Sequence, residues 1–136
     1  MIEAGVNLYS FYEITVGVQW EGEGIEDVIE QFFSPLPFVK RSGIANSVHI
    51  ELKFTTTDAP VDIPHSASGP FYCYDLSIYE ADGHVYLTDG LSIFLLQTQA
   101  GTGLVTLHRS FKEKSPLSKY NFFLVGLIHL LSHRGF

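Results

Sequence analysis

Two histidines near the end of the chain have the spacing of a metal-binding pair. His129 and His133 are four residues apart in a stretch expected to be helical, so they would share one face and could hold one metal ion. The helical zinc-protease motif needs a glutamate after its first histidine, and Leu130 stands there instead. No acidic residue close in sequence offers a third ligand. We therefore favour two histidines that interact with the dipole of a helix C-terminus, and we predict no metal and no cofactor.

A second group of candidate residues lies in a long polar segment, residues 55–70. Asp58, Asp62 and His65 stand in this segment, which contains prolines and shows no periodicity. Binding residues concentrate on loops that a rigid scaffold holds, so this is the best place for a binding role. A plain surface connection is the simpler interpretation of the same residues.

Two further patterns suggest catalysis or phosphate binding only at first sight. Cys73 is the single cysteine, and no paired histidine or basic setting that would activate it is evident nearby, so we predict a packing role. The run Gln99-Ala-Gly-Thr-Gly lacks the Lys-Ser/Thr pair of a phosphate-binding loop and is predicted to be a turn between strands. The sequence thus contains no complete catalytic apparatus.

Several aromatic residues could form a stacking platform for a ligand. Packing in the core of a sheet explains the set more simply, and we predict that role. The set comprises Tyr72, Tyr74, Tyr79, Tyr86 and Phe94.

The elements that would position these residues are mostly strands. Apolar residues alternate with polar ones over 14–20 and 48–54, which predicts two half-buried strands. Three strand-like runs, residues 71–81, 84–88 and 91–97, are joined by Asp82-Gly83 and Asp89-Gly90. Asp-Gly is typical of two-residue turns, so these runs predict an antiparallel meander, to which residues 104–108 add one more strand.

Two helices complete the expected fold. Apolar residues recur with helical spacing from Ile25 to Phe33, and Ser115-Pro116 provides an N-cap and a first-turn proline for a second helix that Gly135 ends. This second helix is apolar nearly all round, which indicates burial on more than one side. We predict one α+β domain, residues 1–136, in which an antiparallel meander of five to six strands packs against two helices.

Composition and charge exclude several classes of protein. A hydrophobic content of 46% with 17% charged residues is not that of a disordered chain. Residues 1–39 contain seven of the acids that give a net charge of −7 and no lysine or arginine, so nucleic acid is not an expected partner. The most apolar stretch is about half of the ~20 residues that span a bilayer. With no signal-peptide pattern and no possible internal disulfide, we expect a cytoplasmic protein.

The last third of the chain resembles a known family. A strand, Asp89-Gly90, a second strand, a loop and a long apolar helix are followed by Leu130-Leu131-Ser132-His133-Arg134-Gly135-Phe136. This arrangement, over residues 71–136, resembles the region just upstream of the ATP-binding core in HPr kinase-like (HPr-Ser kinase/phosphorylase-related) bacterial proteins. The resemblance implies an N-terminal accessory domain whose parent protein continues into a kinase-like core. That core would carry the nucleotide-binding and catalytic residues, and none of them is expected in this chain.

Three functional hypotheses follow. The leading one is a non-catalytic accessory or regulatory domain of an HPr kinase-like, ATP-dependent protein, with the downstream core as its partner and a possible homodimer through the last helix. The alternative is a free-standing module that binds a small molecule or peptide with the 55–70 segment and the sheet face. The third, which we favour least, is a small hydrolase or metal enzyme that uses His65, His129 and His133.

Overall fold

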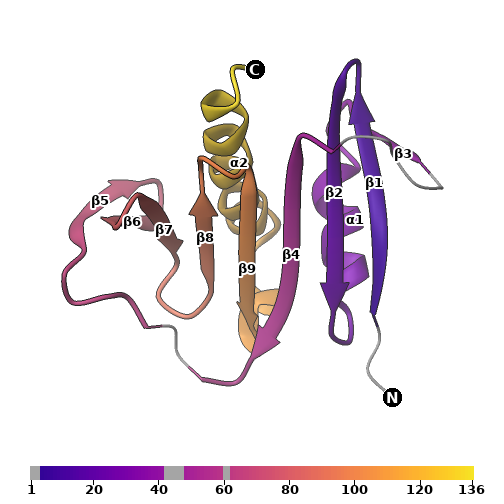
Figure 1. The fold of residues 1–136 in the computed structure, drawn as a ribbon. Coiled ribbons are helices and arrows are strands. Elements are labelled where there is room, and N and C mark those ends of the chain that lie inside the picture. Colours follow the sequence, from indigo (N-terminus) through magenta and orange to yellow (C-terminus); the bar gives the residue numbers. More distant parts are fainter. Residues whose placement is uncertain (1–3, 42–47, 60–61) are drawn as a thin grey trace.

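In the part of the chain that the structure describes, nine strands form one mixed sheet, and two α-helices pack on it (Figure 1). A computed structural model describes residues 4–41, 48–59 and 62–136. Within them the sheet order is β3-β1-β2-β4-β9-β8-β7-β6-β5. The elements in chain order are β1 (Ala4–Phe11), β2 (Ile14–Glu21), α1 (Ile25–Phe33), β3 (Val39–Arg41), β4 (Ile50–Thr57), β5 (Ser68–Cys73), β6 (Leu76–Ala81), β7 (His84–Thr88), β8 (Ile93–Gln97), β9 (Thr102–His108), the 3-10 helix η1 (Arg109–Glu113) and α2 (Pro116–His133).

The centre of the sheet is parallel and its flanks are antiparallel. β2 pairs in parallel with β4, and β4 pairs in parallel with β9, whereas all other neighbours are antiparallel. The carboxyl ends of β2, β4 and β9 therefore meet at one edge, the lower edge of the sheet in Figure 1. In sheets with parallel strands, this edge is where ligand sites usually form.

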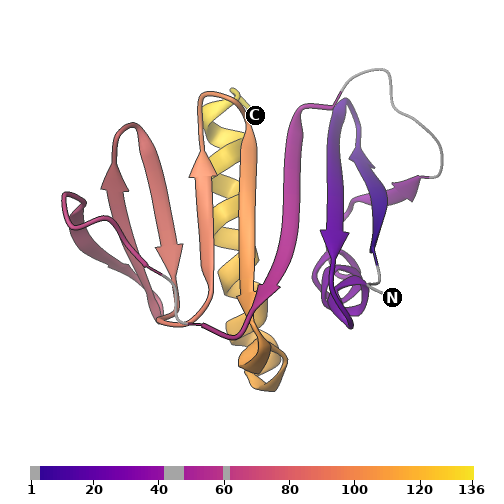
Figure 2. The same cartoon turned by 60° about the horizontal axis from the view of Figure 1, so that its bottom comes forward.

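Both helices lie on the same face of the sheet, behind it in Figure 1. The ring of Phe33 in α1 stacks on Tyr9 of β1 with 3.9 Å between centroids, and Phe122 of α2 packs against Phe94 of β8. Phe32 and Phe123 join the two helices with centroids 5.4 Å apart. The inward side chains of the central strands alternate with exposed or half-buried ones, so the core lies between sheet and helices and the other sheet face is open (Figure 2).

The predicted class, α+β with two helices, is confirmed, and so are the boundaries of the helices. α1 spans Ile25–Phe33, and α2 begins at Pro116 after Ser115, whose hydroxyl accepts a hydrogen bond from the Ser118 amide at 3.2 Å. None of the helices in the described ranges is long and apolar enough to cross a membrane.

The predicted sheet was too small and too uniform. An antiparallel meander of five to six strands was expected, and the described residues form nine strands with a parallel centre. β1 was not predicted because its residues do not alternate between apolar and polar: the core-facing positions include the polar Asn7, whereas Val6 lies on the exposed face. β3 has three exposed residues and no apolar pattern.

Of the two predicted Asp-Gly turns, one is confirmed and one is wrong. Asp82-Gly83 is confirmed as a two-residue turn, with φ of 54° and 79°. Asp89-Gly90 is not one, because Thr88 pairs with Ile93 and four residues connect β7 to β8. The run 71–81 is likewise two strands, β5 and β6, which reverse at Tyr74 with a φ of 57°.

Candidate functional site

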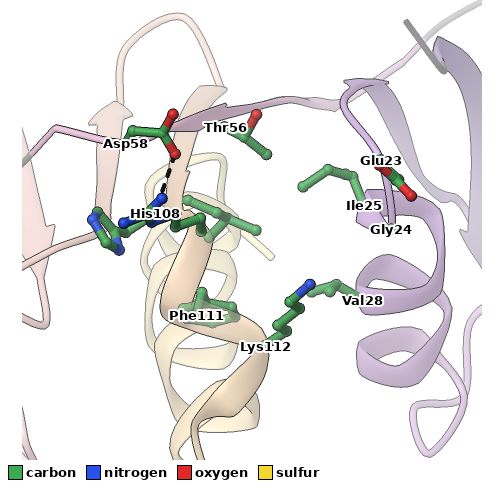
Figure 3. Close-up of a pocket in the computed structure, with 11 residues that line it drawn as sticks. Glu23, Gly24, Ile25, Val28, Thr56, Asp58, His108, Phe111 and Lys112 are labelled. Carbon is green, nitrogen blue, oxygen red and sulfur yellow. Dashed lines mark ion pairs between the residues drawn. The ribbon is translucent and has the colours of Figure 1, made fainter.

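A cavity of about 360 Å³ opens just beyond the carboxyl ends of β4 and β9, between α1 and η1 (Figure 3). Four of its lining residues are apolar: Ile25, Val28, Leu107 and Phe111. Ile25, Leu107 and Phe111 are also buried members of the core, so these walls are part of the rigid scaffold. A pocket with apolar walls and a few polar groups is the usual form of a small-molecule site.

The polar groups around this cavity come from four segments of the chain. Thr56 and Asp58 lie at the end of β4, Glu23 precedes α1, and His108, Arg109 and Lys112 come from the end of β9 and from η1. These residues are far apart in sequence and converge only because β4 and β9 run parallel, with Thr57 opposite His108.

The basic side chains of the site differ in their pairing. Arg109 Nε lies 3.8 Å from Asp58 Oδ1, with both side chains largely exposed, so the pair adds little stability. No carboxylate of the described residues lies within ion-pair distance of Lys112. In Figure 3 the Lys112 ammonium extends toward the space beside Val28. Lys112 is therefore the cation that is most available to a ligand.

His108 is held in place by two neighbours. Its backbone amide donates to Oγ of the fully buried Ser92 at 2.9 Å, and its Nδ1 lies 2.7 Å from Ser110 Oγ. It also caps η1, because Nδ1 accepts the Ser110 amide at 3.2 Å. One ring nitrogen is thus used for structure.

The start of α1 borders the cavity through Gly24 and Ile25. Gly22 and Gly24 have φ of 133° and 77°, so the tight turn between β2 and α1 depends on glycine. Gly24 is the N-cap and offers no side-chain hydrogen bond to the first-turn amides. A helix N-terminus of this kind favours a negatively charged group nearby.

Of the three loop residues singled out from the sequence, only Asp58 lines the cavity. Asp62 and His65 are exposed, and residues 60 and 61 of the same segment lie outside the described residues. The segment is also shorter than expected, because β4 continues to Thr57 and β5 begins at Ser68.

His129 and His133 do share a helix face, as their spacing predicted. Their rings lie 6.0 Å apart at 17° on the exposed side of α2. Among residues 4–41, 48–59 and 62–136, no three metal-ligating side chains come together. The third histidine of the enzyme hypothesis, His65, is therefore not joined to this pair in a metal cluster.

The predicted packing roles hold only in part. Cys73 is half-buried at the end of β5, and Phe94 is fully buried. Tyr79 and Tyr86 face each other on the open side of the sheet, half-buried, and Tyr72 and Tyr74 are largely exposed. Core packing is therefore the right explanation for Phe94 and the wrong one for Tyr72 and Tyr74.

Sequence reasoning missed the basic side of the site. The only local signal was a strand pattern that ends in His108-Arg109 and continues with Phe111-Lys112. The parallel pairing of β4 and β9 brings these residues to the cavity, and no local sequence pattern indicates that pairing.

Comparison of this chain with protein-family models, with curated proteins and with solved structures finds no match.

Proposed function

We propose that this domain binds a small molecule in the cavity between α1 and η1. The observation that carries the proposal is the position of the cavity, at the shared carboxyl edge of three parallel strands, with apolar walls and polar groups from separate elements. Its size falls at the lower end of the range for small-molecule sites, about 300–1,000 Å³. The proposal is for binding: the hydroxyl beside His108 belongs to Ser110, which does not line the cavity, and the same ring nitrogen caps η1.

The test is a thermal-shift screen of a metabolite panel, since a ligand that binds only the folded state raises its stability. Hits are repeated on Thr56→Tyr, which places a ring at the cavity mouth from an exposed lining position. The matched control is Thr55→Tyr, next in sequence, exposed, and on the other face of β4. Hits that Thr56→Tyr abolishes and Thr55→Tyr preserves support the proposal, and a panel without any hit argues against it.

A second candidate function is the accessory or regulatory domain of an HPr kinase-like protein. The end of the segment that carries the resemblance contacts the residue before β4: Arg134 Nε donates to the His49 carbonyl at 3.3 Å, and Phe136 packs edge-on against the His49 ring. Leu117 and Ile128 of α2 are exposed, which leaves apolar surface for a kinase-like core or for a second copy of the chain. Reading the coding sequence beyond residue 136 tests this: a Gly-Lys-Ser/Thr motif within a few tens of codons supports it, and its absence contradicts it.

A further inference from the structure

A second cavity adjoins the first. It measures about 650 Å³ and lies between α1 and the start of α2, with Val28 in the walls of both cavities. Phe32 and Pro35 line it on the α1 side, and Leu117, Tyr120 and Phe123 line it on the α2 side. Val28 lines both cavities, so they lie next to each other along α1, and we call the two together the groove.

The two ends of this groove differ in chemistry. The end beside η1 has the cations Arg109 and Lys112 and the carboxylates Glu23 and Asp58. Asp58 pairs with Arg109, and no carboxylate of the described residues lies within ion-pair distance of Lys112. The end beside α2 is predominantly apolar, and its only charged lining residue is Lys119, whose methylene stem can cover apolar surface while the ammonium stays at the rim. A ligand that satisfies both ends has an anionic head and a single apolar chain.

We propose that the groove binds a free single-chain anionic amphiphile, such as a medium-chain fatty acid. Its carboxylate lies at Lys112 and its chain passes Val28 toward Leu117 and Tyr120. This inference rests on the proposed function, since the head occupies the cavity assigned there. Exposure of Leu117 (69%) in the absence of ligand is explained by the same arrangement, because the chain covers it.

The test is calorimetric titration with hexanoate, octanoate, decanoate and dodecanoate, each below its critical micelle concentration. Each buried methylene is expected to lower Kd about fourfold until the groove is filled. Lys112→Met is expected to weaken all four acids about tenfold, because it removes the cation and keeps much of the stem. Leu117→Ser is expected to weaken dodecanoate selectively and to leave hexanoate unchanged.

Matched controls separate the groove from general stickiness. Ile128→Ser removes an apolar side chain that is also exposed on α2 but lies outside both cavities, and Lys53→Met removes an exposed cation on the open sheet face. Both are expected to bind like the unmodified protein. An equal loss in Ile128→Ser and Leu117→Ser overturns the proposal.

The other outcomes are equally distinct. If hexanoate and dodecanoate bind equally and both depend on Lys112, the small-molecule site stands and the amphiphile assignment falls. If dodecanol or dodecyltrimethylammonium binds as tightly as dodecanoate, the ligand does not need an anionic head and the proposal is overturned. If the protein co-sediments with phosphatidylglycerol vesicles and this depends on Lys112, the anionic group belongs to a membrane lipid, and the proposal of a free acid is overturned. If none of the acids binds, this inference falls, and the proposed function is then decided by the metabolite panel alone.

Discussion

Gly126 of α2 packs directly against the ring of Phe94 in β8. A Cβ at residue 126 would lie 2.5 Å from Phe94 Cε2, and on the opposite edge of the ring a Cβ at Gly103 would lie 2.5 Å from Cε1. The ring is fully buried between the two glycines, so it cannot easily shift to make space for a methyl group. The approach of α2 to the sheet therefore depends on the absence of side chains at these two positions.

Gly126→Ala is expected to destabilise the protein although alanine favours helices. Helix propensity gains about 1 kcal/mol, whereas forcing a methyl group into a packed core costs about 1–3 kcal/mol. We expect a net loss of about 1 kcal/mol in the free energy of unfolding, measured by urea denaturation. Ser132→Ala, at an exposed position of the same helix, is the control and should change little.

The double variant decides whether the ring is the cause. In a Phe94→Leu background the smaller side chain frees the space that the new methyl group needs, so Gly126→Ala should cost less there. Strict additivity of the two substitutions would contradict a clash between the new methyl group and the Phe94 ring.

Asp89 ties the β7–β8 connection to the segment before α2. Its Oδ1 accepts the amides of Leu91 and Ser92 at 3.0 and 2.7 Å, and its Oδ2 lies 3.2 Å from Lys114 Nζ. The Asp89 side chain is 3% exposed. Since Ser92 in turn accepts the His108 amide, this connection also supports the candidate site.

Asp89→Ala is expected to lower the free energy of unfolding by about 2–3 kcal/mol, because the amides of Leu91 and Ser92 and a partly buried ammonium lose a buried acceptor. The matched control is Asp58→Ala, which breaks a pair with Arg109 whose side chains are 76% and 81% exposed. That change should cost well under 1 kcal/mol. Equal effects of the two substitutions would show that burial does not decide the strength of these pairs.

Glu23 gives a further test of the anionic ligand. It lines the first cavity and is exposed, so its charge would oppose a carboxylate at Lys112 without contributing to the core. Glu23→Gln is expected to tighten decanoate binding by about two- to threefold at low salt, and the gain should shrink at 0.5 M salt because screening weakens exposed charge interactions. The calorimetric titration measures both effects, and Glu13→Gln, an exposed acid in the β1–β2 turn, serves as the control.

Local patterns predicted the elements that have local causes. α1 follows from its apolar spacing, α2 from Ser115-Pro116, and the β6–β7 turn from Asp82-Gly83, where both residues have positive φ. β1 could not be read in the same way, because polar Asn7 takes a core-facing position and contributes to a hydrogen-bonded group with Tyr9.

The candidate site was largely beyond sequence reasoning for a related reason. Asp58 was singled out with Asp62 and His65 from the polarity of one segment, and only Asp58 lines the cavity. Thr56, His108 and Lys112 meet because β4 and β9 pair in parallel across a connection that contains four other strands. Pairing between strands so far apart in sequence depends on the whole core, and no periodicity within either strand encodes it.

The buried Tyr9 should make the stability of the protein depend on pH in the alkaline range. Its side chain is buried, and burial, together with the negative charge of Glu30, raises the pKa of the hydroxyl above its usual value near 10. The hydroxyl donates to Glu30 Oε1 at 3.2 Å, and Lys40 Nζ donates to the same oxygen at 2.6 Å. This hydrogen bond to Glu30 raises the pKa of Lys40 as well.

Both shifts have the same sign. Above pH ~10 the unfolded chain releases the Tyr9 proton while the folded chain retains it, so the free energy of unfolding falls as the pH rises, by at most about 1.4 kcal/mol per pH unit. Lys40 stabilises the folded state below its unfolded pKa of ~10.4, and this stabilisation is lost as the pH rises through its folded pKa. The stabilisation is small because Lys40 and Glu30 are both about half exposed. Tyr9→Phe removes the larger effect. Urea denaturation from pH 8 to 11 should therefore show a steeper decline for the unmodified protein than for Tyr9→Phe, and parallel declines would contradict a buried, protonated Tyr9.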